Sequence, residues 1–284
     1  MDLVTMKPIL AEARKHRYAA GAFTFGSLDT AYAIIDAANR AGMPVILQAG
    51  PLECDYAGTY ELARIAEFAA KRAKVPVALN LDHGDTTDRA LEAIEAGFTS
   101  VMIDASRFDY EENIRITKEV VKMAAPKGLS VEAELGKIGG AEGLSDIADH
   151  EASQTDPGEA AEFAERTKID ALAVAIGTGH GFYKQAPVLN IKRLSDIAKK
   201  TNVPLVLHGG SGTPEPQVLE AIRSGVVKVN ICTEFLAAMG KAFGECTKAE
   251  NFRYSYPALF GPARSAGGAL VYEKIKFFAD GRAV

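Results

Sequence analysis

The chain has 284 residues, of which 48% are hydrophobic and 24% are charged. This composition supports a substantial core and excludes an intrinsically disordered chain. The 32 basic and 37 acidic residues give a net charge of −5, with no lysine- or arginine-rich run, so we expect neither nucleic acid nor a membrane surface as a partner.

Residues 1–18 have the pattern of an amphipathic helix with scattered charges. They lack the apolar core and cleavage site of a secretory signal, and no part of the chain reaches the roughly 18 consecutive apolar residues that a membrane span needs. The cysteines Cys54, Cys232 and Cys246 are far apart and form no CxxC motif, so we expect no disulfide framework. Together these features predict a cytoplasmic protein.

Short β-rich runs alternate with longer amphipathic segments along the chain. Most of the short runs are almost continuously apolar, as in parallel strands that are covered on both faces. The predicted strands are residues 21–25, 44–48, 75–82, 100–105, 129–135, 171–177, 203–209 and 226–232.

Amphipathic segments fill the gaps, and several end in Gly or Asn, which commonly terminates a helix. The predicted helices are residues 29–42, 59–74, 86–97, 111–128, 156–168, 190–202 and 214–225. This alternation predicts an α/β protein with a (β/α)8 TIM barrel, organised as a single domain over residues 1–284 with extra C-terminal helices. A doubly wound open sheet is the alternative, but no Gly-rich dinucleotide-binding motif follows the first strand. We interpret the long Gly/Asp-rich segment 136–157 as a functional loop.

Polar side chains gather at the C-terminal ends of the predicted strands, where TIM barrels carry their chemistry. Among the five histidines, His83, His180 and His208 lie at such ends on three different strands. Imidazoles that converge from separate strands are typical of Zn²⁺ with an open fourth position, although each histidine alone would also fit a hydrogen-bonded strand end. Asp104 and Glu134 are oxygen donors close by, and they would orient the ligands, form a second metal position or cap loops.

Two Gly-rich segments surround two of these histidines: GTGHGFY at 177–183 and HGGSG at 208–212. The loops after the seventh and eighth strands of such barrels commonly bind phosphate through backbone N–H groups, and a helix N-terminus follows HGGSGTPE. NICTE at 230–234 adds an amide and a hydroxyl at the eighth strand end. Each turn alone also fits tight-turn geometry, but together they predict a phosphate site.

A metal beside a phosphate site implies a phosphorylated substrate with an oxygen atom for the metal to polarise. A carbonyl next to a hydroxyl would bind through both oxygens, and the metal would stabilise the enediolate that proton loss creates. Such chemistry also needs an acid/base pair, for which Asp82 and Glu142 are the available carboxylates.

Five motifs together resemble the class II, metal-dependent ketose-bisphosphate aldolases, which include the fructose- and tagatose-bisphosphate enzymes. In chain order they are LDHG (81–84), EAELGKIGGAEG (132–143), AIGTGHGFY (175–183), LVLHGGSG (205–212) and KVNICTE (228–234). The resemblance implies a (β/α)8 fold and a lyase of carbohydrate metabolism, as in glycolysis. The reaction would reversibly cleave a ketose phosphate to dihydroxyacetone phosphate and an aldehyde.

The resemblance also implies roles for individual residues. His83, His180 and His208 match the zinc ligands, and Glu134 and Asp104 match positions linked to an alternative metal site. Asp82 matches the residue that exchanges a proton with the C4 hydroxyl, and Glu142 matches the loop acid at the nucleophilic carbon. The positions that match the pocket for dihydroxyacetone phosphate are Gly181, Gly209, Gly210, Ser211, Asn230 and Thr233. A monovalent cation (Na⁺ or K⁺) often assists there, and the enzymes are usually homodimers or homotetramers.

The chain departs from the family pattern mainly on the aldehyde side. Thr24 stands where the family usually has Asn, Gly50 where a serine is common near the distal phosphate, and Cys232 where the fructose enzymes have Asp. The segment 256–258, YPA, aligns with a DPR segment whose arginine binds the distal phosphate, commonly across a subunit interface. Our hypothesis is that the aldehyde is not glyceraldehyde 3-phosphate, unless Arg253 or Arg264 substitutes for that arginine.

Two other functions compete with an aldolase. A metal-dependent sugar-phosphate isomerase or epimerase would share the metal and the base but would not need Asp82 beside a C4 oxygen. A non-catalytic subunit that stabilises a true aldolase would be expected to lose metal ligands, and all three histidines are present.

Overall fold

The computed structural model describes residues 1–138, 154–181, 183, 185–248 and 252–279. Its strands form a closed barrel in the order β1-β2-β3-β4-β5-β6-β7-β8, and every neighbouring pair is parallel. The strands are β1 Ala20–Thr24, β2 Val45–Ala49, β3 Val77–Gly84, β4 Ser100–Ile103, β5 Ser130–Leu135, β6 Ala171–Val174, β7 Leu205–Leu207 and β8 Val226–Ile231. The predicted TIM barrel is therefore confirmed, and the open sheet is wrong.

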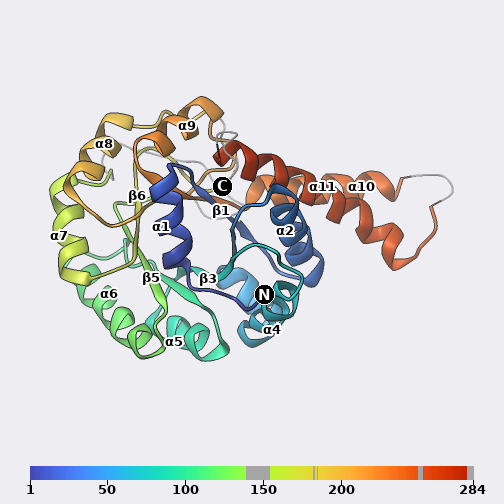
Figure 1. The fold of residues 1–284 in the computed structure, drawn as a ribbon, viewed down its shortest axis with the longest axis horizontal. Helices are drawn as coiled ribbons and strands as arrows, with labels where there is room; N and C mark the ends of the chain where they lie inside the picture. Colours follow the sequence, from blue (N-terminus) through green and yellow to red (C-terminus); the bar gives the residue numbers. More distant parts are fainter. Residues whose placement is uncertain (139–153, 182, 184, 249–251, 280–284) are drawn as a thin grey trace.

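A ring of helices covers the barrel (Figure 1). The helices of the structure, including those outside this ring, are α1 Met6–His16, α2 Leu28–Ala41, α3 Pro51–Ala57, α4 Thr59–Ala70, α5 Thr87–Ala96, α6 Tyr110–Ala124, α7 Pro157–Thr167, α8 Ile191–Lys200, α9 Glu215–Arg223, α10 Thr233–Cys246 and α11 Tyr256–Phe278, with a short 3-10 helix at Ala125–Lys127. Side chains cap several helix starts, among them Ser27, Thr86, Asp109 and Asp156, which accept backbone N–H bonds. The sequence pattern did not predict α3, whose 7 residues are too few to show a helical period.

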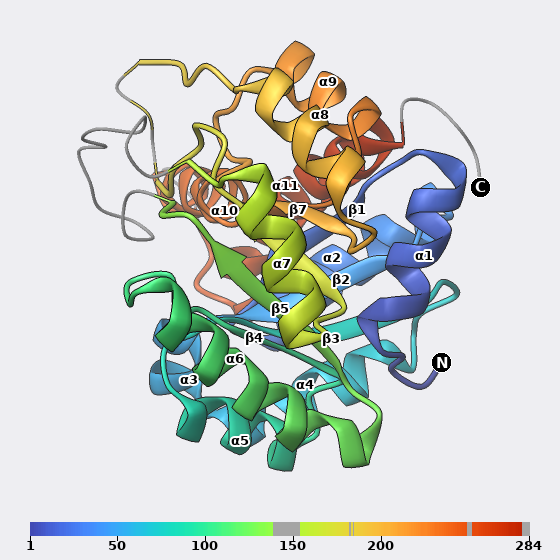
Figure 2. The ribbon, with the colours of Figure 1, turned by 90° about the vertical axis from the view of Figure 1, so that its left-hand side faces the viewer.

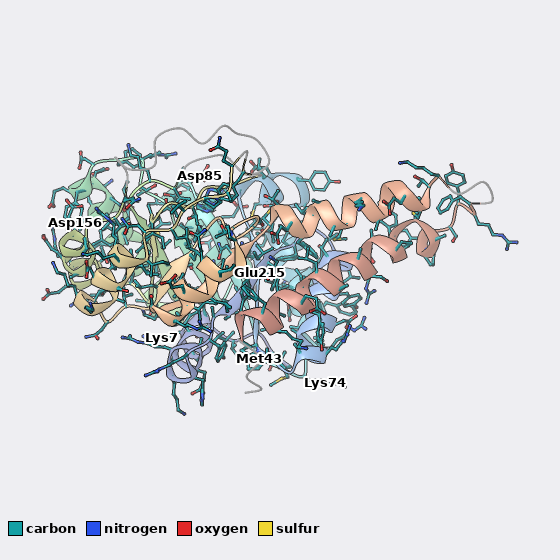
Figure 3. All side chains as sticks on the ribbon, turned by 90° about the horizontal axis from the view of Figure 1, so that it is seen from above. Lys7, Met43, Lys74, Asp85, Asp156 and Glu215 are labelled. Carbon is teal, nitrogen blue, oxygen red and sulfur yellow. The ribbon has the colours of Figure 1, made fainter. Side chains whose placement is uncertain are left out.

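The N-terminal segment closes one end of the barrel. The backbone N–H groups of Met6 and Lys7 donate to the hydroxyls of Ser100 and Ser130 at the starts of β4 and β5 (2.9 Å each). In Figure 2, α1 lies at the opposite end of the barrel from the tip of the β5 arrow. In Figure 3, Lys7 likewise lies on the opposite side of the molecule from Asp85, which follows β3. The other end, where the strands finish, is the mouth of the barrel.

The extra C-terminal helices are present as α10 and α11. They lie side by side and extend beyond the ring of helices as an arm, at the right of Figure 1. Only Phe235 of α10 is buried, whereas α11 buries residues along its length, including Val271 and Ile275. In the part of the chain that the structure describes, no helix combines the length and the apolarity that crossing a membrane would take.

Gly84 offers a test of the strand geometry at the mouth. A Cβ atom at Gly84 would lie 2.4 Å from the carbonyl oxygen of Met102 and 2.8 Å from Leu81 Cδ2, so the two strands would have to move apart. We expect Gly84→Ala to lower the free energy of unfolding by about 1–3 kcal/mol, measured by urea denaturation.

Gly240→Ala is the matched control. Gly240 lies inside α10 and is exposed, and a Cβ atom added there would meet no other atom within 4 Å. Because alanine is favoured over glycine in a helix, this change should raise the free energy of unfolding by up to about 1 kcal/mol. Equal stabilities of the two variants would contradict the close approach at Gly84.

Candidate functional site

Asp82 and His83 are adjacent in the sequence, yet both side chains contact residues at the mouth. A regular strand would point consecutive side chains to opposite faces. Here the pairing of β3 with β4 shifts register between Leu81 and Gly84, and His83 has a left-handed φ of 46°. The sequence placed the strand end at Asp82, but β3 continues to Gly84 through this irregularity. The bulge lets a carboxylate and an imidazole serve the same site.

His83, His180 and His208 come together at the mouth. His83 Nε2 lies 3.1 Å from His180 Nε2 and 2.7 Å from His208 Nδ1. These residues form one of the two groups of side chains, among the described residues, whose donor atoms could hold a metal ion. A zinc ion bound at about 2.0–2.1 Å would separate such nitrogens by about 3.3–3.4 Å, so the cluster has nearly the required spacing.

The outer nitrogens of two of these rings contact carboxylates. His83 Nδ1 lies 3.0 Å from Asp104 Oδ2, and His208 Nε2 lies 2.8 Å from Glu132 Oε1. Each carboxylate accepts a hydrogen bond, which places a proton on the outer nitrogen and directs the inner one at the cluster. Inner nitrogens only 2.7 Å apart need a cation or a proton between them, so the residues present fit a metal ion.

The electrostatics of the cluster agree with this geometry. Burial lowers the pKa of His83, but the carboxylates of Asp82 and Asp104 outweigh it and raise this pKa to about 10. Burial and the charge on His83 hold the pKa of His208 well below its ordinary value. The neighbouring carboxylates therefore favour positive charge at the cluster, which a metal ion would supply.

His83, Asp104 and Glu134 form the other group that could hold a metal. Glu134 Oε2 is buried, has no hydrogen-bond partner among the described groups, and lies 4.0 Å from His83 Nδ1. Burial and the neighbouring Asp104 raise the pKa of Glu134 well above its ordinary value. Burial also raises the pKa of Asp104, but its hydrogen bond with His83 outweighs this and holds the pKa below the usual range.

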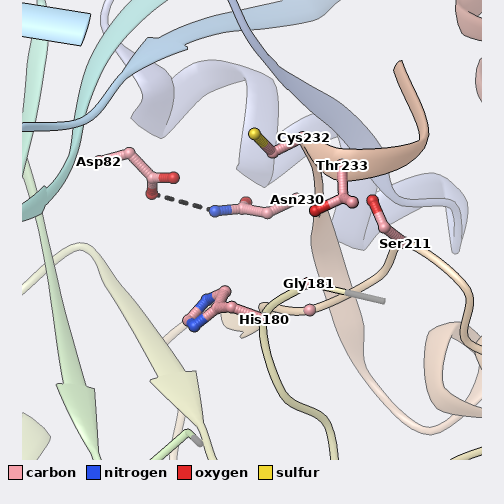
Figure 4. Close-up of a pocket in the computed structure, with 8 residues that line it drawn as sticks. Asp82, His180, Gly181, Ser211, Asn230, Cys232 and Thr233 are labelled. Atoms are coloured by element: carbon pink, nitrogen blue, oxygen red, sulfur yellow. Dashed lines mark hydrogen bonds between the residues drawn. The ribbon is translucent and has the colours of Figure 1, made fainter. Parts of the chain in front are cut away.

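Asp82 is buried and held by two side-chain amides. Its Oδ2 accepts from Gln48 Nε2 at 2.8 Å, and its Oδ1 accepts from Asn230 Nδ2 at 3.0 Å (Figure 4). The amides leave the carboxylate fixed in orientation beside the histidine cluster. The sequence analysis did not identify Gln48 as a site residue, because a single glutamine in the apolar run PVILQ belongs to no recognisable motif.

A pocket opens beside Asp82 and His180. Its lining includes Gly181, Gly209, Ser211, Asn230 and Thr233, all expected from the sequence. Cys232, which the sequence analysis grouped with the departures on the aldehyde side, also lines this pocket. Figure 4 shows Ser211 and Thr233 next to each other across from Asp82. The backbone of Gly209 (φ 65°) passes so close to Gly179 that a Cβ would lie 2.3 Å from its carbonyl oxygen, so the loops after β6 and β7 meet there without side chains.

One residue expected in this pocket lies beside it. Gly210 does not line it; its N–H donates to the Asn230 carbonyl at 3.2 Å, and a Cβ would lie 2.6 Å from Val229 Cγ1. Its lack of a side chain lets the β7 loop approach β8. Glu142 lies outside the described residues, as does most of the loop expected at 136–157.

Comparison with known proteins gives a consistent result over the whole chain. The family model "Fructose-bisphosphate aldolase class-II" matches residues 4–281. The chain is 41% identical over 281 residues to a fructose-bisphosphate aldolase of Staphylococcus aureus strain Mu50, covering 98% of each chain. It is also 41% identical over 283 residues to that of Geobacillus stearothermophilus, covering 99% of this chain and 98% of the relative.

A solved structure agrees. The crystal structure of the YdjI aldolase from Escherichia coli K12 matches with a TM-score of 0.87 at 36% identity, covering 97% of each chain. The protein is therefore a lyase and belongs to the class-II fructose-bisphosphate aldolase family of metal-dependent enzymes.

Proposed function

We propose that the protein is a zinc-dependent aldolase that reversibly cleaves a ketose phosphate to dihydroxyacetone phosphate and an aldehyde. The observation that carries this proposal is the cluster of His83, His180 and His208 nitrogens beside a glycine-lined pocket. Zinc suits a three-imidazole donor set with an open position better than magnesium or calcium, which prefer oxygen ligands. A zinc ion held there would supply positive charge beside the carbonyl and hydroxyl oxygens of the substrate.

The pocket suits the phosphate of dihydroxyacetone phosphate. Ser211 and Thr233 bring hydroxyls, and Thr233 begins α10, whose N-terminal N–H groups favour an anion. Gly181 and Gly209 allow the backbone to approach the phosphate closely. We propose that Gly210 contributes to this site by letting the loop after β7 approach β8. We also propose that the assisting monovalent cation (Na⁺ or K⁺) binds in this pocket.

Asp82 is the group that we assign to proton exchange with the C4 hydroxyl. Its two amide partners keep both oxygens fixed, so the carboxylate needs no reorganisation when the proton moves. Glu142 is the acid that we assign to the proton at the nucleophilic carbon. Glu134 and Asp104 would hold the metal in an alternative position.

We propose that the aldehyde is not glyceraldehyde 3-phosphate. Gly50 supplies no hydroxyl beside β2, and the Glu53 carboxylate accepts its N–H at 3.0 Å. Glu53 places an acidic side chain, not a basic one, at this edge of the mouth. Burial and the charge on Asp82 raise its pKa, although hydrogen bonds from backbone N–H groups lower it. Arg264 donates to Asp36 Oδ2 at 2.6 Å, and Arg253 lies in the connection between α10 and α11.

We also propose a homodimer or homotetramer in the cytoplasm. The arm and α3 expose large apolar side chains that a second copy would cover, including Leu52 (63% exposed), Tyr56 (89%) and Phe243 (37%).

We expect zinc affinity to depend strongly on each of the three histidines. We expect His208→Ala to weaken zinc binding by more than about 100-fold, since removing a ligand should cost more than removing a residue that orients one. Competition with a chromogenic chelator measures this affinity. The control is His16→Ala, whose ring lies on α1 beside Glu12 (3.2 Å). Equal affinities for the two variants would remove His208 from the metal site.

Asp82→Asn tests the proton transfer at C4. The substitution keeps the size of the side chain, so we expect the metal site to survive while cleavage slows by about 10²–10⁴-fold. Exchange of a dihydroxyacetone phosphate proton with solvent, followed by NMR in deuterated water, should persist because that step uses Glu142. Asp85→Asn is the control, since Asp85 bonds to Arg89 (3.0 Å) and does not line the pocket. Loss of exchange and cleavage together would contradict the separate roles.

The aldehyde side is tested with substrates that differ only in the distal phosphate. We expect fructose 1-phosphate to be cleaved with a kcat/KM at least equal to that of fructose 1,6-bisphosphate, because no arginine among the described residues lines the pocket beside Asp82 to bind the second phosphate. Release of triose product, measured with a coupled dehydrogenase, gives both constants. A large preference for the bisphosphate would overturn this part of the proposal.

A further inference from the structure

A lysine and a glutamate form an ion pair in the interior of the barrel. Lys228 of β8 donates from Nζ to Glu132 Oε2 of β5 at 2.8 Å, and both side chains are fully buried (0% exposed). Neither residue lines the pocket beside Asp82. The pair therefore lies behind the site rather than in contact with a substrate there.

The other oxygen of the same carboxylate reaches the histidine cluster. Glu132 Oε1 lies 2.8 Å from His208 Nε2, and His208 Nδ1 lies 2.7 Å from His83 Nε2. Lys228, Glu132 and His208 thus form a continuous chain of hydrogen bonds that ends at the proposed metal position.

Stability does not explain the pair. Burying a charged lysine and a charged glutamate carries a desolvation penalty that their attraction often fails to recover, and apolar side chains of the same volume would commonly serve the core as well. A buried pair with a hydrogen bond to a metal ligand points instead to the geometry of that ligand.

The chain of hydrogen bonds has a direction. A lysine ammonium can only donate, so Glu132 must accept on Oε2 as a carboxylate. A carboxylate can only accept from His208, which places the ring proton on Nε2 and leaves the Nδ1 lone pair facing the cluster. Asn230 Nδ2 also lies 3.4 Å from His208 Nε2. This contact does not compete with Glu132 for the ring proton, because an amide nitrogen can only donate and Nδ2 already donates to Asp82.

We propose that Lys228 is a positioning residue for the metal: it holds Glu132 as a fixed acceptor, and Glu132 fixes the Nε2–H tautomer and the orientation of His208. The metal-binding part of this inference rests on the proposed role of His208, whereas the tautomer part does not. A neutral replacement of the pair would remove the acceptor that selects the proton on Nε2, and only the contact between His208 Nδ1 and His83 Nε2 (2.7 Å) would then bear on the tautomer.

The test compares Lys228→Met with the double variant Lys228→Met/Glu132→Gln. The single change leaves an uncompensated carboxylate in the core and should lower the midpoint of thermal unfolding. The double change removes both charges, so it should recover stability. Its neutral amide can nevertheless turn either its oxygen or its nitrogen toward His208, so the tautomer should become mixed and zinc affinity should stay about 10–100-fold below that of the unsubstituted protein.

Two readouts decide between positioning and packing. In metal-free protein labelled with ¹⁵N-histidine, the imidazole shifts of His208 report its tautomer, and chelator competition reports zinc affinity. Lys274→Met is the control, because it breaks a mostly buried pair with Glu234 (2.7 Å) outside the histidine cluster. It should leave the tautomer and the affinity unchanged.

A double variant that keeps a pure Nε2–H tautomer and the zinc affinity of the unsubstituted protein would overturn the proposal and leave the pair a packing role. Should the single variant fail to fold, the double variant still gives this result. If the unsubstituted protein bound no zinc, the proposed function would fail, while the tautomer would still test the part played by Lys228.

Discussion

The ring nitrogens His180 Nε2 and His208 Nδ1 lie within 3.1 Å of His83 Nε2, and the rest of the site depends on this convergence. Such close lone pairs repel one another unless a positive charge lies between them. Asp104 and Glu132 fix the outer nitrogens, and the glycine-lined pocket opens beside the same cluster. The barrel supplies the constraint, because parallel strands deliver all their C-terminal ends to one mouth.

The sequence predicted the barrel well because buried parallel strands are apolar runs and the intervening helices have a clear period. It also predicted the histidine cluster, since a barrel brings strand ends together. It could not predict the bulge at His83, which depends on the pairing with β4. The sequence also could not predict the Lys228–Glu132 ion pair, because the two residues are far apart in the chain and only the closed barrel brings β5 and β8 side chains into contact.

The mouth has two halves of different character. Around His180 and Ser211 the pocket has glycines and hydroxyls, as an anion requires. Around Asp82 the neighbours are amides and the carboxyl of Glu53, whose pKa is raised by burial and by Asp82. The carboxylate of Asp82 and the lack of a lysine or arginine among the described residues that line the pocket disfavour a second phosphate on this side, in line with the proposed substrate that carries a single phosphate.

The most direct test of the metal-dependent aldolase is condensation itself. Zinc-loaded protein is incubated with dihydroxyacetone phosphate and a panel of phosphorylated and unphosphorylated aldehydes, with and without EDTA, and products are resolved by chromatography. We predict condensation with an unphosphorylated aldehyde that EDTA abolishes and added zinc restores. Condensation that persists after the metal has been removed would contradict a metal-dependent aldolase.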